Sequence, residues 1–106
     1  MIRAEFFVTS RQRLVGFHIS GHAGYAVSGE DVVCAFVSSA AYLTANTITE
    51  VIGVSAQAEA EDGDMLVRIS EKDAERCKDV LEGLKLHLLN TEEEYPDHVK
   101  VIITEV

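Results

Sequence analysis

A histidine and a cysteine separated by a glycine-punctuated segment are the residues of this chain best suited to chemistry. His22 follows a strand pattern, and Cys34 stands near the expected start of a helix pattern. A cysteine in the first turns of a helix has its thiol pKa lowered by the positive end of the helix dipole, and a nearby imidazole lowers it further or acts as a base. Asp31 stands between them as a candidate orienting group. Together with backbone N–H groups at the helix start, these parts predict acyl transfer by a thiol nucleophile.

The same residues have simpler interpretations. A lone cysteine on a helix usually serves packing, and a lone histidine in a loop is usually solvated. His22, Asp31 and Cys34 are also of types that bind zinc, but no fourth ligand stands at a suitable spacing. We therefore expect no metal and no cofactor. Cys77 belongs to an apolar helical stripe and is expected to be a small buried residue.

Alternating and helical apolar patterns predict an α+β fold in a single domain over residues 1–106. Two β-hairpins and a C-terminal strand are expected to form a mixed sheet packed with two helices, in the order β-β-α-β-β-α-β. Strand patterns cover residues 2–9, 15–20, 54–60, 65–69 and 99–106, and the second helix pattern runs from about Glu71 to Asn90.

The first helix is expected to begin with Ser28 or Asp31 as its cap and to end near Gly53. With Asp31 as the cap, Cys34 is the third helical residue. Ser38 follows one turn later, where its hydroxyl either reaches the thiol region or bonds a helix carbonyl. Helical spacing predicts a buried stripe made of Val33, Phe36, Val37, Ala40, Leu43, Thr47, Ile48 and Val51.

The connection before this helix contains Gly21, Ala23, Gly24 and Gly29. It is longer than a compact domain usually needs, and such loops often act as lids over a site. We expect this segment to contact a substrate.

The balance of charge bears on the partners. The formal net charge is -9, with acidic runs at residues 59–64 and 92–94. Phosphate backbones would be repelled, so no direct nucleic-acid or anionic-membrane binding is expected, whereas a basic protein or peptide would be attracted. The simpler interpretation of the acidic runs is solvated loops that keep the protein soluble. No apolar segment is expected to span a membrane, and two cysteines form no disulfide framework, so we expect a cytoplasmic protein.

The chain also resembles the ribosomal-processing cysteine protease (Prp) family over essentially its whole length. The resemblance is carried by Gly21-His22-Ala23-Gly24, by Asp31-Val32-Val33-Cys34-Ala35 with Val37-Ser38, and by Thr91-Glu92-Glu93-Glu94-Tyr95. It implies a bacterial cysteine endopeptidase that removes a short N-terminal extension from a basic large-subunit ribosomal protein during ribosome maturation.

The resemblance also assigns roles to residues. His22 matches the family's base and Cys34 its nucleophile. Asp31 and Ser38 match supporting positions, where Asp31 either orients His22 or caps the helix. The glycine loop, about residues 23–30, is implied to be mobile and ordered by substrate, and the family's members are homodimers. Phe36 stands where members commonly have a smaller residue.

Two rival hypotheses remain on the sequence alone. The first is a non-catalytic ribosome-assembly factor that binds a basic ribosomal protein segment through its acidic face. The second is a thiol hydrolase of a small substrate, which gains no support because the chain has no recognisable cofactor or phosphate-binding loop.

Overall fold

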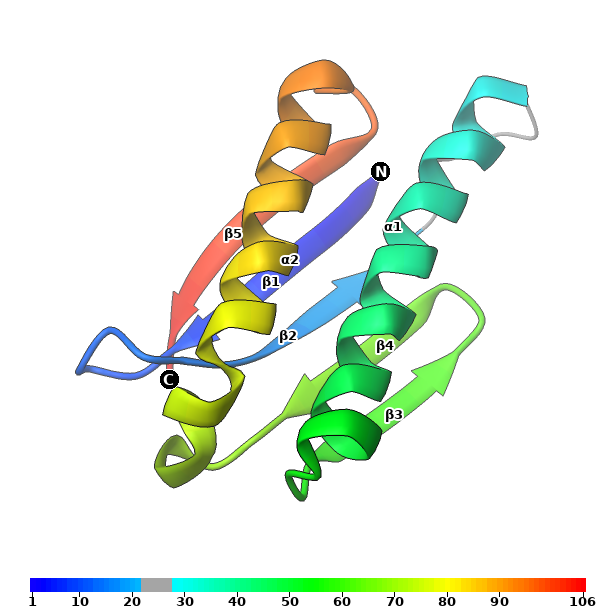
Figure 1. The fold of residues 1–106 in the computed structure, drawn as a ribbon. Coiled ribbons are helices and arrows are strands. Elements are labelled where there is room, and N and C mark those ends of the chain that lie inside the picture. The colour runs from blue at the N-terminus through cyan, green and yellow to red at the C-terminus, as the bar shows by residue number, and fades with distance from the viewer. Residues whose placement is uncertain (22–27) are drawn as a thin grey trace.

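Five strands form one mixed sheet, and two helices cover one of its faces (Figure 1). The computed structural model describes residues 1–21 and 28–106, with the side chains of α1 described from Val32 onwards. The elements are β1 (Ile2–Val8), β2 (Leu14–Ser20), α1 (Ser28–Asn46), the π-helical η1 (Thr47–Ile52), β3 (Gln57–Glu61), β4 (Asp64–Arg68), the 3-10 helix η2 (Glu71–Asp73), α2 (Ala74–Glu94) and β5 (Val99–Glu105). This confirms the predicted α+β fold and its element order.

The strand order is β3-β4-β2-β1-β5, with β1 and β5 parallel and the other pairs antiparallel. Both predicted hairpins form, and β2 joins them by pairing with β4. Figure 1 shows α2 over the β1 and β5 side of the sheet and α1 over the β2 and β4 side. The sheet therefore brings the end of β2 and the β3–β4 turn under the same helix.

The core lies between the sheet and the helices. Phe6 and Phe17 are opposite each other in the β1–β2 register, are fully buried, and have ring centroids 6.2 Å apart. Their burial follows from strand alternation, which sends every second side chain to the helix-covered face. The predicted stripe of α2 is confirmed, because its members are all buried: Ala74, Cys77, Leu81, Leu84 and Leu88.

The predicted buried stripe of α1 is wrong in part. Phe36 is 51% exposed, Leu43 69% and Val51 78%, whereas the sheet-facing side is made of Val33, Val37, Ala41, Thr44 and Ile48. At about 100° per residue those buried residues share one side of the helix, and Phe36 and Leu43 lie outside it. The apolar surface of α1 is wider than the part of the helix that packs on the sheet. The helix also widens to π geometry at η1, which shifts the later side chains.

The stretch Val32–Ile52, which spans most of α1 and all of η1, bears on the membrane prediction. By length and composition it is apolar enough to cross a membrane, with a mean hydropathy of 1.4, so the expectation that no segment reaches that limit is wrong on those terms. One such helix is weak evidence for a membrane span, since a core helix passes the same test. Here one side of the stretch packs on the sheet.

Two element boundaries differ from prediction because local hydrogen bonds extend the helices. The α2 helix continues to Glu94, four residues past the predicted end at Asn90. The hydroxyl of Thr91 is satisfied within the helix by donating to the carbonyl of His87 at 2.8 Å. After α1, Gly53 adopts a left-handed φ of 79° and the N–H of Val54 donates to the carbonyl of Ile48. The chain is still leaving the helix at residue 54, so β3 begins only at residue 57.

Candidate active site

Of the two helix starts that the sequence allowed, the structure agrees with the one at Ser28 and not with Asp31 as the cap. Because α1 begins at Ser28, Cys34 is the seventh residue of the helix and lies about 9 Å along the axis from its first residue. The favourable effect of the helix dipole is confined to the first turn. The dipole therefore favours the thiolate of Cys34 less than it would with Asp31 as the cap, and the roles of the helix-start amides in thiol activation and in an oxyanion site stay predictions.

Cys34 lines a cavity of about 420 Å³ that is bounded by α1 on one side and by the sheet and the β3–β4 turn on the other. Cys34 itself is half-buried and packs against the core. This volume lies within the range of sites that hold small ligands or a few residues of a peptide. Besides Cys34, the described lining consists of Ile2, Ile19, Gly21, Val37, Ser38, Ala41, Tyr42, Ala60, Glu61, Asp62, Gly63, Asp64 and Met65.

Gly21, the residue immediately before His22 in the sequence, lies at the edge of this cavity. Its φ is 90°, and a Cβ at this position would lie 2.4 Å from the carbonyl oxygen of Met1. Glycine is required by both the backbone angle and the close approach. The N–H of Gly21 donates to the carbonyl of Gly63 at 3.0 Å, which ties the end of β2 to the β3–β4 turn. The chain therefore leaves the sheet towards His22 from the cavity edge.

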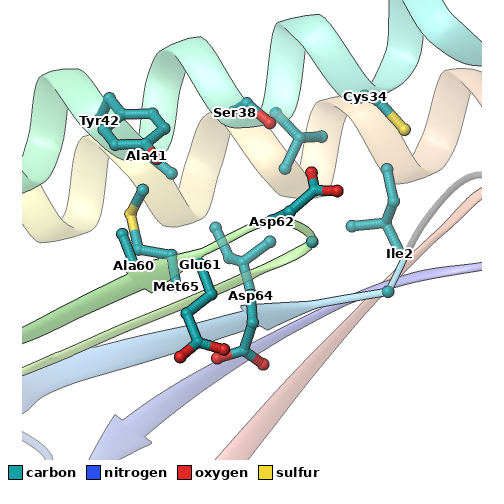
Figure 2. Close-up of a pocket in the computed structure, with 14 residues that line it drawn as sticks. Ile2, Cys34, Ser38, Ala41, Tyr42, Ala60, Glu61, Asp62, Asp64 and Met65 are labelled. Atoms are coloured by element: carbon teal, nitrogen blue, oxygen red, sulfur yellow. The ribbon is translucent and has the colours of Figure 1, made fainter.

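Three carboxylates lie on the hairpin side of the cavity, and they point in two directions. Figure 2 shows the Asp62 carboxylate directed towards the side of α1 that bears Cys34 and Ser38, whereas the Glu61 and Asp64 carboxylates point away from the helix. Asp64 is held on the opposite side of the sheet by the Nε2 atom of His18 at 2.8 Å. Asp62 is the carboxylate best placed to meet a molecule bound at Cys34.

From the sequence, the acidic run at residues 59–64 was interpreted either as attracting a basic partner or as a solvated loop, and its place at the cavity was missed. The acidic run was visible in the sequence, but its position opposite Cys34 depends on β4 pairing with β2. That long-range pairing leaves no local pattern around Cys34. Met65 also comes from an element that only the tertiary fold brings to the cavity, whereas Tyr42 lies on α1 itself, one turn after Ser38, where helical spacing could have found it.

The structure brings three of the predicted site residues together: Gly21, Cys34 and Ser38 line the same cavity. Gly29 and Asp31 belong to the first turn of α1. His22, Ala23 and Gly24 lie outside the described residues. The predicted roles of these residues stay predictions. Phe36 is not among the cavity-lining residues described here, so its larger side chain does not shape this cavity.

The second cysteine has a different environment. Cys77 is fully buried on α2 and is not part of the described cavity lining. Burial, followed by the negative charge of Asp73, raises the pKa of the Cys77 thiol above its usual value of 9.0, while Arg76 lowers it. Such a thiol is a poor nucleophile at neutral pH. Among residues 1–21 and 28–106, no group of three or more His, Cys, Asp and Glu side chains is arranged to hold a metal ion.

Comparisons with known proteins agree on one family. The family model described as cysteine protease Prp matches residues 1–100. A relative from Bacillus subtilis (strain 168), named ribosomal processing cysteine protease Prp, is 24% identical over 107 residues, which are 95% of this chain and 96% of the relative.

Solved structures show the same fold. The essential ribosomal processing protease Prp from S. aureus, in complex with a covalently linked product peptide, superposes with a TM-score of 0.86 at 22% identity, covering 98% of this chain and 100% of that one. Protein SMU.848 from Streptococcus mutans gives a TM-score of 0.82 at 29% identity, covering 100% of this chain and 96% of that one.

Proposed function

Because this chain belongs to the cysteine protease Prp family, we propose that it is a cysteine endopeptidase that removes the short N-terminal extension of a large-subunit ribosomal protein. The observation that carries the proposal is the cavity, in which the Cys34 thiol and Gly21, the residue covalently joined to His22, line the same space. The relative from Bacillus subtilis carries a ribosomal processing name, and the S. aureus structure holds a product peptide.

In the proposed mechanism Cys34 is the nucleophile and His22 is the general base and acid. The imidazole of His22 takes the thiol proton, and the sulfur attacks the scissile carbonyl carbon. Collapse of the tetrahedral intermediate breaks the C–N bond, and the imidazolium returns the proton to the leaving amine. Water, deprotonated by the same imidazole, then hydrolyses the thioester and restores the Cys34 thiol. Ser38 and Asp31 have supporting roles in this proposal, and neither forms a bond with the substrate.

The substrate side of the proposal rests on charge. The chain carries a formal net charge of -9, and Asp62 points into the cavity. Ribosomal proteins are basic because they bind RNA, so this surface attracts the substrate and repels the RNA to which it later binds. We place the reaction on the free ribosomal protein in the bacterial cytoplasm, where two isolated cysteines stay reduced.

The proposal includes a homodimer. The sheet leaves four large apolar side chains of α1 and η1 uncovered: Val32, Phe36 and Leu43 of α1 and Val51 of η1. Exposed apolar groups gathered along one element are typical of a protein interface. Light scattering of the wild-type protein and of Leu43→Glu tests this part. We expect a dimer mass for the wild type and a monomer mass for the variant, and a monomeric wild type would contradict it.

The test of the enzymatic proposal is mass spectrometry of the protein incubated with the host's own precursor of the ribosomal protein. We expect one N-terminal cut by the wild type and by Cys77→Ala, and no cut by Cys34→Ala or His22→Ala. Circular dichroism of each variant establishes that the fold is kept. Cleavage by Cys34→Ala at the wild-type rate would overturn the mechanism.

The non-catalytic assembly factor is the second candidate, favoured only by the acidic surface. It predicts tight binding of the precursor with no cut by either the wild type or Cys34→Ala. The same incubation, followed by size-exclusion chromatography of the mixture, separates the two candidates.

A further inference from the structure

We propose that the peptide substrate binds as an additional strand along the outer edge of β3 and passes the β3–β4 turn into the cavity that holds Cys34. The inference rests on the proposed function, since it names the surface by which an endopeptidase of this fold would hold an extended peptide. Binding by strand addition gains main-chain hydrogen bonds from any sequence, and pockets for alternate side chains then give specificity.

The first observation is that β3 is an open edge. Within the described residues the sheet order ends at β3, which pairs only with β4, and all five residues of β3 are exposed. An edge strand presents unpaired N–H and C=O groups that another extended chain can pair with. Five residues of strand extend for about 16 Å, which is enough to hold several residues of a peptide.

The second observation gives the direction of those groups. Asp62 and Gly63 form a two-residue turn, so the flanking pair Glu61 and Asp64 exchanges hydrogen bonds across the hairpin. Bonded and non-bonded pairs alternate in an antiparallel ladder. The N–H and C=O groups of Ala60 and Ala58 are therefore turned away from β4 and are available to an added strand.

The third observation is that this edge leads into the cavity. Ala60, Glu61 and Asp62 line the space that also holds Cys34. Figure 2 shows Ala60 below Tyr42 and Ala41 of α1, with the Asp62 carboxylate further along towards Cys34. A peptide paired with β3 would therefore cross the β3–β4 turn to enter the cavity that holds the thiol, and the small side chain of Ala60 leaves room beneath the helix.

Charge favours a peptide over a second copy of this chain as the occupant of the edge. Glu59 and Glu61 project from the same face of β3, because they are two residues apart in the strand. Pairing this strand with its own copy would bring like charges together across the new ladder, which is unfavourable. A neutral or basic peptide meets no such repulsion.

The test uses a synthetic peptide that spans the processing junction of the host's ribosomal protein precursor, together with a series of the same peptide N-methylated at one backbone amide at a time. Removing one edge hydrogen bond should weaken binding to the Cys34→Ala protein by about fivefold. Because alternate amides of an added strand face β3, we expect losses at every second position on one side of the scissile bond and near-wild-type binding at the positions between.

The matching change in the protein is Ala58→Pro, which removes an outward N–H without breaking the β3–β4 ladder and is of a kind that edge strands accept. We expect the KM of this variant for the unmodified peptide to rise about fivefold. The fold-change in kcat should be smaller than the fold-change in KM. If the wild type leaves the peptide uncut, the proposed function fails. If the wild type cuts it but N-methylation shows no alternation and Ala58→Pro keeps the wild-type KM, strand addition is wrong while the protease assignment stands.

Discussion

Selective alkylation of the two cysteines tests the distinction between a reactive and a structural thiol. Cys34 is half-buried and lines an open-sided cavity, whereas Cys77 has 0% of its surface exposed. Iodoacetamide at near-neutral pH should therefore modify Cys34 in the folded protein and leave Cys77 intact. The thiolate is the reacting species, and burial also raises the pKa of Cys77.

The size of the effect follows from the stability of the fold. Cys77 can be alkylated only when α2 opens away from the core, and a domain of this size has an unfolding free energy of about 5–15 kcal/mol. At 5 kcal/mol the open fraction is about one in 5,000, so a need for complete opening would slow Cys77 by between about three and four orders of magnitude relative to an accessible thiol. Fraying of α2 at lower cost would reduce this ratio to about a hundredfold.

The assay is intact-protein mass spectrometry over time, with peptide mapping to assign each adduct. Cys34→Ala and Cys77→Ala serve as the matched controls, because each leaves one thiol to follow. In denaturant the two cysteines should react at similar rates. Equal rates in the folded protein, or an inert Cys34 beside a reactive Cys77, would refute the assignment of Cys34 as the accessible thiol.

Four further predictions concern stability, activity and charge. Cys77→Ala should keep wild-type cleavage but lower the unfolding free energy by about 1–2 kcal/mol through a small cavity. Because burial raises the pKa of the Cys77 thiol, wild-type stability should fall as pH rises above 9.0 towards the folded-state pKa, and chemical denaturation of Cys77→Ala should lack this loss. Gly21→Ala should lower the unfolding free energy by about 1–3 kcal/mol and reduce kcat/KM. Gly53→Ala is the control, because Gly53 also has a positive φ, 79°, but nothing lies within 4 Å of the new Cβ, and it should leave cleavage unaffected. Equal losses of activity in the two variants would contradict the role of Gly21. Raising the salt concentration from about 0.1 M to 1 M should lower kcat/KM for the basic precursor, because the screening length shortens from about 10 Å to 3 Å. Asp62→Asn should show a weaker salt dependence of kcat/KM. If kcat/KM of the wild type does not change with salt, electrostatic attraction is contradicted.

Most of the strands and helices could be predicted from the sequence, because each produces a local periodicity of apolar residues. The alternation in β1 and β2 and the stripe of α2 repeat over several turns or residues, and both correspond to buried faces in the structure. The stripe of α1 was harder to predict because its sequence is apolar on more than one side. Choosing the buried side requires knowing the position of the sheet, which local spacing does not contain.

In the candidate site, too, the residues that follow a local pattern could be predicted and those brought in by long-range contacts could not. Cys34 and Ser38 were found from their residue types and from helical spacing, and both line the cavity. The opposite wall could not be predicted, because Asp62 reaches the cavity only when β4 pairs with β2 and the N–H of Gly21 bonds Gly63. Those contacts join residues about 40 to 50 positions apart and follow from topology, not from any short motif.

The start of α1 bears on what activates the nucleophile. The sequence allowed Ser28 or Asp31 as the cap, and the observed start at Ser28 places Cys34 six residues into the helix, where the dipole is weaker than in the first turn. In the proposed mechanism the imidazole of His22 activates the thiol. The rate of Cys34 alkylation measures this directly: in His22→Ala it should be lower than in the wild type at neutral pH. An unchanged rate would mean that His22 does not activate the thiol in the absence of substrate.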